Sequence, residues 1–374
     1  MKKYVYFIAI FTITALFLST GAFAQNGKRA KKAEMRAKSK EMSRFTVKTK
    51  FGRSKQYASF GTFLGMSNYF GDLAPRNGRG STSLKLSRTY FGAFYQKRVN
   101  ANIALRGHLA WARLRGDDFN APFDKGNVEK ARYVRNLSFR NDVIELGLSG
   151  TIDILPTDRG YLRRNFLNGY GLLGIMGFYH NPKGKVPTGY NLPQAGNWIA
   201  LQPLGTEGQG LKGYAKKYFR IQPAVMIGGG VRYRIADKLD LGLEIAWRFT
   251  FTDYIDDVST SYAKDEDVRD GVKDRLWYAM SNKSGQPLSS TGKKRKTEFY
   301  QPENFPGKPS DNGGDFGGLV RADGYGVFEG TDSQGLPLLS VGSPRGNTDK
   351  DGYTVTTLSA TYIMEFRAKT PKFR

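Results

Sequence analysis

Two short blocks combine tyrosine with carboxylates, SNYFGDL at residues 67–73 and DYIDD at residues 253–257. Carboxylates that converge on one point can bind Ca²⁺ through their oxygens or act as general acids and bases. Neither DYIDD nor the acids between Asp311 and Asp315 follow the spacing of a calcium-binding loop. We therefore expect solvated loop acids that cap turns, and no metal site.

Other candidate chemistry is weak. GYGLLG, from Gly169 to Gly174, matches the glycine pattern of dinucleotide-binding loops, but the segment is itself strand-like and a loop follows it where a helix would be needed. The chain has no cysteine and only two histidines, His108 and His180, with no GxSxG-type elbow near either. We expect no cofactor and no enzymatic activity. A hydrolase that uses His108 is the remaining enzymatic alternative.

The N-terminus has the organisation of a secretory signal peptide. Lys2 and Lys3 precede an apolar run that ends in Ala22-Phe23-Ala24, an A-x-A-like cleavage site. We predict a signal peptide at residues 1–24. Beyond it, no uninterrupted apolar stretch reaches the ~20 residues that a membrane-spanning helix needs.

The chain is strongly basic. Its formal net charge of +25 becomes +23 once Lys2 and Lys3 leave with the signal peptide. Residues 25–55 carry 12 Lys and Arg against Glu34 and Glu41, and we predict a basic periplasmic leader there. In an exported chain this charge favours lipopolysaccharide phosphates or an acidic protein as partners, and not nucleic acid.

Composition and periodicity indicate β structure. The chain contains 45 Gly, 25 Phe and 21 Tyr, and within residues 238–252 Leu241, Leu243 and Ile245 alternate with Gly242 and Glu244. Segments of this kind reach 15 residues, longer than the ~5–6 of most soluble strands and sufficient for the ~9–11 of a membrane-spanning strand. They predict eight strands, at residues 57–66, 87–99, 102–114, 141–154, 166–178, 221–235, 238–252 and 353–366.

The connections between these strands alternate in length. Asn100 and its neighbours, or Ala236-Asp237-Lys238, make two of them very short, while the following ones are long. Short periplasmic turns and long extracellular loops are typical of outer-membrane barrels. We predict an all-β fold, a closed antiparallel outer-membrane β-barrel of about eight strands over residues 56–374, in which residues 253–352 form a long extracellular loop. A secreted sandwich is the alternative, and an extra hairpin from Val320–Phe328 and Leu336–Val341 would raise the strand count to ten.

The faces opposite the apolar ones would meet inside the barrel. An eight-stranded barrel is only wide enough to be filled by side chains, so we expect a packed salt-bridge core and no pore. The predicted lumen charge network comprises Arg88, Arg98, Arg106, Glu145, Asp153, Arg232, Arg234, Glu244 and Arg248, with Gln96, His108 and Gln222 on the same faces.

SNYFGDL and the later segment IGGGVRYRIADKLDLGLEIAWRFTFTDYIDDVS, residues 227–259, resemble the PorG-type outer-membrane barrels of the Bacteroidetes type IX secretion system. The resemblance covers roughly residues 57–260 and the last strand. It implies a non-enzymatic barrel associated with a periplasmic ring, made of a PorK-like lipoprotein and a PorN-like protein. The family-motif positions are Asn68, Tyr69, Gly71, Asp72, Asp253, Tyr254, Asp256 and Asp257.

The expected topology places the SNYFGDL block at the outer surface. We expect Tyr69 and Phe70 in the headgroup belt, with Asp72 capping a turn that Gly71 permits. Ring contacts must then come from periplasmic parts: the leader, residues 156–164 and residues 369–374. We predict Arg159, Arg163 and Arg164 as the partner-binding residues. The alternative function is an outer-membrane channel or receptor that binds an external ligand through its long loops.

Overall fold

The alternating segments form eight long strands in the computed structural model, which describes residues 56–74, 85–121, 132–133, 135–157, 160–188, 192–263, 274–284, 286–295 and 345–364. The strands are β1 (Ala58–Phe70), β2 (Arg88–Arg98), β3 (Ile103–Asp117), β4 (Ser138–Asp153), β5 (Leu167–Tyr179), β8 (Ile221–Ala236), β9 (Leu239–Thr250) and β10 (Gly352–Met364). All eight predicted strands are present. β1 runs to Phe70, four residues further than expected, because its pairing with β10 continues to Phe70 and Gly352.

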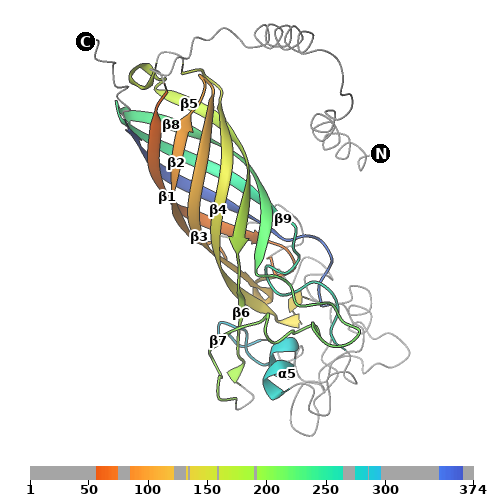
Figure 1. Ribbon diagram of the computed structural model, residues 1–374. Coiled ribbons are helices and arrows are strands. Elements are labelled where there is room, and N and C mark those ends of the chain that lie inside the picture. The colour runs from red at the N-terminus through yellow and green to blue at the C-terminus, as the bar shows by residue number, and fades with distance from the viewer. Residues whose placement is uncertain are drawn as a thin grey trace, which may run out of the picture. The chain divides into compact units, whose positions relative to one another are not determined.

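The sheet closes on itself. β1 pairs antiparallel with both β2 and β10, and the extra pairing of β3 with β4 joins the remaining edges. Around the barrel the order is β3, β2, β1, β10, β9, β8, β5, β4 (Figure 1). This arrangement confirms the predicted closed antiparallel barrel. Closure lets every strand satisfy its backbone hydrogen bonds without water.

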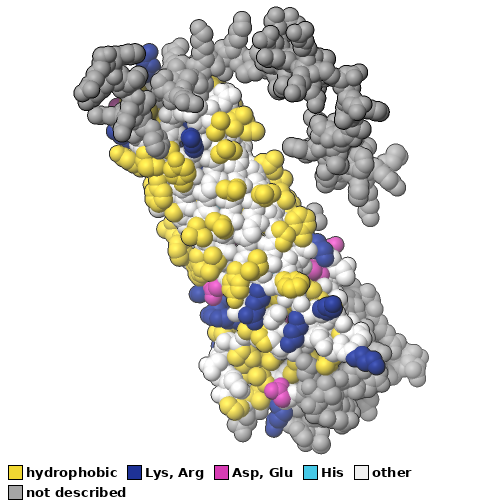
Figure 2. Space-filling view, viewed as in Figure 1, with side chains coloured by type: hydrophobic (Ala, Val, Ile, Leu, Met, Phe, Trp, Pro, Cys, Tyr) yellow, Lys and Arg dark blue, Asp and Glu magenta, His cyan; other side chains and the backbone are white. Residues whose placement is uncertain are grey.

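Apolar side chains cover the outside of this barrel. On β4, Ile144, Leu146 and Leu148 are 50–68% exposed, whereas Glu145 between them is fully buried. Figure 2 shows the exposed apolar side chains as a broad band, which we call the apolar band. An exposed apolar surface of this extent must contact something other than water, and on a closed barrel that is lipid.

The two ends of the barrel differ. At one end, the turn end, β2 joins β3 through residues 99–102 and β8 joins β9 through residues 237–238. The opposite loop end carries β6 (Pro182–Lys185), β7 (Trp198–Ala200) and the helix α5 (Arg275–Ser281), as Figure 1 shows. β6 pairs with β4 beyond the end of β5, and β7 pairs with β6, so neither strand belongs to the closed ring. The predicted asymmetry of turns and loops is therefore confirmed.

Apolar packing orders part of the loop end. Trp277 of α5 packs with Tyr262 and Ala263, and Met280 packs with Val186 and Leu201. No helix in the described part of the chain is long and apolar enough to cross a membrane. The predicted signal peptide, the basic leader, the extra hairpin and residues 369–374 lie outside the described residues.

Candidate functional site

The centre of the lumen is organised around one carboxylate. Glu145 on β4 accepts hydrogen bonds from the hydroxyls of Tyr90 (3.0 Å) and Tyr353 (2.8 Å). Arg248 Nη2 and His108 Nε2 lie 3.5 and 3.7 Å from the same carboxylate oxygen. Side chains from β2, β3, β9 and β10 therefore converge on β4 and tie opposite walls of the barrel together.

A second pair lies next to it. Arg106 Nη1 is 2.6 Å from Glu244 Oε2, and the hydroxyl of Tyr170 donates to the same oxygen at 2.8 Å. The Nε of Arg106 donates to Gln96 Oε1 at 3.2 Å, while its guanidinium stacks 4.6 Å from the centre of the Phe94 ring. The Arg106 guanidinium is thus paired with Glu244 and covered by the Phe94 ring.

The third pair lies nearer the turn end. Asp153 accepts from Arg98 and lies 3.3 Å from Arg232 Nη1. Asn168 Nδ2 donates to Asp153 at 3.3 Å, and Arg98 Nε donates to the hydroxyl of Tyr57 at 3.0 Å. Two arginines thus share one buried carboxylate.

Two predicted lumen arginines and Gln222 lie elsewhere. Arg88, at the loop end, donates to the backbone oxygens of Lys85 and Ser87. Arg234 pairs at 2.5 Å with Asp237, which is 66% exposed at the turn-end rim. Gln222 donates to the carbonyl of Phe219 outside the network.

The predicted partner-binding arginines are in different environments. Arg164 is buried and donates two hydrogen bonds to Asp240 Oδ1, from Nε at 2.9 Å and from Nη2 at 2.7 Å. It also donates to the backbone oxygens of residues 161, 236 and 237. Arg164 therefore closes the turn end of the lumen, whereas Arg163 is exposed and Arg159 lies outside the described residues.

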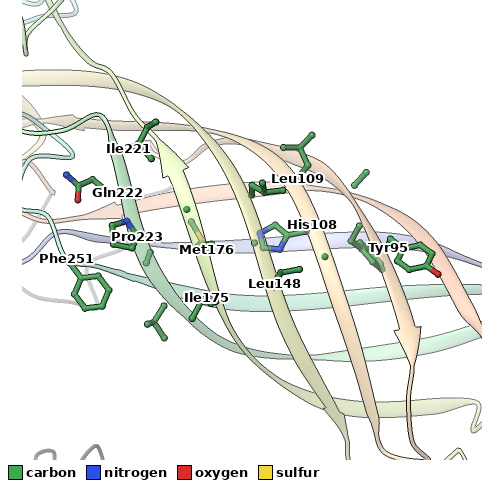
Figure 3. Close-up of a pocket in the computed structure, with 18 of the residues that line it drawn as sticks. Tyr95, His108, Leu109, Leu148, Ile175, Met176, Ile221, Gln222, Pro223 and Phe251 are labelled. Carbon is green, nitrogen blue, oxygen red and sulfur yellow. The ribbon is translucent and has the colours of Figure 1, made fainter. Parts of the chain in front are cut away.

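Little space remains inside. A lumen cavity lined by Tyr90, Arg106, His108 and Arg248 measures about 20 Å³, room for about one water molecule. A much larger hollow of about 1180 Å³ is drawn in Figure 3. Of its lining residues, Leu109, Leu148, Ile175 and Ile221 are 58–73% exposed, so this hollow belongs to the lipid-facing wall.

The two family-like blocks meet at the loop end, although about 180 residues separate them. The hydroxyl of Tyr69 lies 2.7 Å from Asp256 Oδ2 and 2.6 Å from Asp351 Oδ1. Asp72 accepts from the backbone N–H of Asn347 at 3.0 Å. Asp253 also lies in this region, and its carboxylate accepts from Ser259 Oγ at 2.6 Å. We call Asp72, Asp253, Asp256 and Asp351 the carboxyl cluster.

The geometry requires a bound proton. A phenol donates only one hydrogen, so two short contacts at the Tyr69 hydroxyl need one of the two carboxyls to be protonated. Burial, reinforced by the neighbouring carboxylates, raises the pKa of Asp256 and of Asp351 well above the usual range. Burial also raises the pKa of Asp72 to about 7, against the lowering effect of Arg135, and that of Asp253 to about 8.

Three expectations for these blocks are wrong. The acids of DYIDD are not solvated, because Asp253, Asp256 and Asp257 are all buried. Tyr69 is buried inside the loop end and does not lie in a headgroup belt, and Phe70, which is only 4% exposed, stacks 5.2 Å from Trp247. Asp72 bonds to residue 347 and does not cap its own turn.

Position 71 requires glycine for a different reason from the one expected. Its φ lies outside the left-handed region. A Cβ at this position would overlap the Tyr69 hydroxyl and the Asp351 carboxylate. The absence of a side chain therefore lets the cluster form.

A further set of contacts surrounds the cluster. Asp257, with φ 70°, accepts from Thr206 Oγ1 at 2.5 Å and from the hydroxyl of Tyr218 at 2.7 Å. Arg345 lies 3.3 Å from Glu207 and donates to the carbonyl of Asp257 at 2.6 Å. These bonds fix the strained position of Asp257.

The remaining motif residues lie at the edges. Tyr254 stacks 4.8 Å from Tyr218. Asn68 faces outward and accepts from Ser87 Oγ at 2.5 Å. Within the part of the chain that the structure describes, neither Tyr254 nor Asn68 hydrogen-bonds a carboxylate of the carboxyl cluster.

Asp351, Glu207 and Arg345 were not among the predicted site residues. Asp351 had a usable signal, since it directly precedes the predicted strand at residues 353–366, and in a closed barrel the last strand pairs with the first, which leads to Tyr69. Glu207 and Arg345 lie in long connections, 52 and 88 residues from the partners Ser259 and Asp257. No local sequence pattern predicts pairings over such separations.

Chemically, this arrangement clamps loops together. Among the described residues, no group of three or more His, Asp or Glu side chains could hold a metal ion. His180 is buried against Tyr218 with its Nε2 3.2 Å from the carbonyl of Phe219, and burial lowers its pKa to about 4. His108 faces Glu145 inside the filled lumen.

A closed barrel with an apolar band, a filled ion-paired lumen and short turns at one end is an outer-membrane β-barrel protein, and the chain lies in the outer membrane. No family model matches the sequence, and no curated protein matches it.

Several solved structures are similar in part. Ail, the attachment invasion locus protein of Yersinia pestis, solved with the heparin analogue sucrose octasulfate, is 9% identical with a TM-score of 0.31, covering 83% of this chain and 99% of that chain. Neisserial surface protein A is 14% identical with a TM-score of 0.25, covering 53% and 84%. A Pseudomonas aeruginosa FadL homologue is 11% identical with a TM-score of 0.20, covering 82% and 90%. At these values we draw no functional conclusion from the similarity.

Proposed function

We propose that this protein is a non-enzymatic outer-membrane barrel that anchors the periplasmic ring of a type IX protein secretion system. The filled lumen carries the proposal. In the described part of the barrel, three buried ion-pair groups and a lumen cavity of about 20 Å³ occupy the space between the two ends, which argues against a transport path. A barrel without a transport path can still hold a partner at the membrane. The resemblance of its two sequence blocks to PorG-type barrels points to a ring of PorK-like and PorN-like proteins.

The turn end offers the surface for such a partner. The short 3-10 helix Tyr161–Arg163 presents Arg163 and Leu162, which is 52% exposed. Arg164 holds this segment in place through its bonds to Tyr161 and Asp240. Arg164 is therefore a positioning residue, and Arg163 with Arg159 forms the contact.

The test is recovery of ring proteins from cross-linked membranes. The double variant Arg159→Glu/Arg163→Glu leaves Arg164 intact, so the barrel should fold while co-purification of the ring proteins falls at least tenfold. Lys212→Glu/Lys216→Glu, which reverses two exposed charges on the loop end, should change nothing. Unchanged recovery with the double variant at normal expression would reject the anchoring surface.

The ordered loop end favours a second candidate, an outer-membrane receptor. α5 and residues 251–263 pack into defined apolar clusters, a platform that an external ligand could contact. Planar-bilayer recordings distinguish the channel form of this alternative, because a filled lumen predicts no conductance. Steady single-channel currents would contradict the anchoring role as the sole function.

A further inference from the structure

A row of cations crosses the outer wall at the loop end. Arg115 on β3 is directly opposite Arg140 on β4, and Arg140 is directly opposite Lys183 on β6. Arg113, two residues before Arg115, faces the same side and pairs with Asp142 at 2.6 Å. We call Arg113, Arg115, Arg140 and Lys183 the arginine patch. Like charges directly opposite each other on neighbouring strands are destabilising. Asp142 and Asp117 supply only two carboxylates for these four cations, so the row favours a further anion.

The patch keeps unused hydrogen-bond donors. Arg140 donates to no other described residue, and its Nε lies 4.0 Å from Asp142, whose carboxylate is already held by Arg113. The Nε of Arg115 also has no partner among the described residues, and its Nη2 reaches Asp117 only at 3.4 Å. Guanidinium groups bind phosphate through two parallel N–H donors. The Nε atoms are themselves buried, so a phosphate would reach the exposed Nη groups of Arg115 and Arg140, whose side chains are 20% and 27% exposed. The patch therefore has the charge and the donors to take one or more phosphates.

The position of the arginine patch relative to the membrane indicates which ligand it binds. The outward residues that precede Arg113 on β3 are Trp111 and Leu109, and Leu109 is 58% exposed in the apolar band. Two residues of strand span about 7 Å, so the guanidinium groups lie one headgroup depth beyond the hydrocarbon. Figure 2 shows Lys and Arg side chains gathered directly beyond the apolar band at this end. Arg113 stacks 5.1 Å from the Trp111 ring and Arg140 4.9 Å from the Trp198 ring, contacts that hold them at the interface.

We propose that the arginine patch binds the phosphate groups of lipopolysaccharide, with the lipid's acyl chains on the apolar wall below Trp111. This rests on the outer-membrane placement and on the loop end facing outward, and not on the ring-anchoring role. Lipopolysaccharide fits because it joins phosphates and acyl chains in one molecule. A free anion would use only the patch.

The experiment measures lipopolysaccharide binding to the full mature protein in detergent micelles by native mass spectrometry. Arg115→Gln/Arg140→Gln should weaken binding at least tenfold, while the control Lys97→Gln/Lys216→Gln, which removes two exposed cations elsewhere, should not. Dephosphorylated lipopolysaccharide should bind both proteins equally weakly. Equal binding of intact lipopolysaccharide to wild type and patch variant would overturn the proposal, and full displacement by millimolar inorganic phosphate would overturn the choice of lipid.

A second readout separates binding from structure. The variant removes repulsion between Arg115 and Arg140, and this offsets the loss of the long Arg115–Asp117 contact at 3.4 Å and of the Arg140–Trp198 stacking. Its thermal midpoint in lipopolysaccharide-free detergent should therefore stay close to that of wild type. Added lipopolysaccharide should raise the wild-type midpoint more than that of the variant. A variant that is less stable without lipid would mean that the patch is structural, and the proposal would fail. Arg140→Gln alone, which removes a side chain that has no hydrogen-bond partner among the described residues, repeats the test if the double variant does not fold.

Discussion

Glu145→Gln measures how much the central lumen carboxylate contributes to the stability of the barrel. The change keeps the shape of the side chain but removes the ion-pair partner of Arg248, which is buried. A guanidinium cannot release its proton in a protein, so Arg248 has no way to become neutral. Breaking a buried ion pair by removing one partner costs about 3–5 kcal/mol. We expect a loss of that size in the free energy of unfolding.

Asp237→Asn is the matched control. It is also a carboxylate-to-amide change opposite an arginine, Arg234, but Asp237 is 66% exposed at the rim. Solvent screens this pair, so its loss should cost about 0–1 kcal/mol. The two variants differ mainly in burial.

Urea titration in detergent micelles, followed by tryptophan fluorescence at pH 7, measures both unfolding free energies. Equal losses in Glu145→Gln and Asp237→Asn would refute the view that the lumen is a desolvated charge core. Adding Arg248→Met to Glu145→Gln should recover part of the loss, since Met removes the buried charge that Glu145→Gln leaves without its partner.

Three further outcomes follow from the two barrel ends. Asp256 and Asp351 have raised pKa values, so their stabilising effect is complete below about pH 4, the unfolded value, and is lost as pH rises through the folded values. Proteolysis of the loop end should therefore accelerate from pH 5 to 9, and a flat rate would contradict this. Tyr69→Phe should raise hydrogen exchange across residues 253–258, with a local loss of about 1–3 kcal/mol, while the barrel stays folded; unaltered exchange would count against the clamp. Arg164→Gln should lower the heat-modifiability midpoint on gels, because Asp240 loses a buried partner, and an unshifted midpoint would show that the turn end does not depend on it.

Period-two alternation predicted the barrel strands because each side chain meets either lipid or the lumen. β9 is the clearest case, where Leu241, Leu243 and Ile245 face outward and Glu244 faces inward. The same rule placed Arg98, Arg106 and Arg248 on the lumen face. It could not choose their partners, because Arg106 and Glu244 are 138 residues apart and meet only through closure of the sheet.

The loop end could be predicted only in part. The residues of SNYFGDL and DYIDD are informative types, but whether such acids are solvated or buried depends on the fold of connections that lack a repeating pattern. The turn end shows the same limit. Arg163 and Arg164 are adjacent in sequence, yet one is exposed and the other is buried against Asp240.

Pairing of β1 with β10 runs from Ala58 and Met364 to Phe70 and Gly352. The seam that completes the cylinder therefore joins strands at opposite ends of the polypeptide, with the other six strands between them. Contacts of such long range form slowly. The chain must cross the periplasm with its first strand unsatisfied, and insertion can finish only when the last strand arrives.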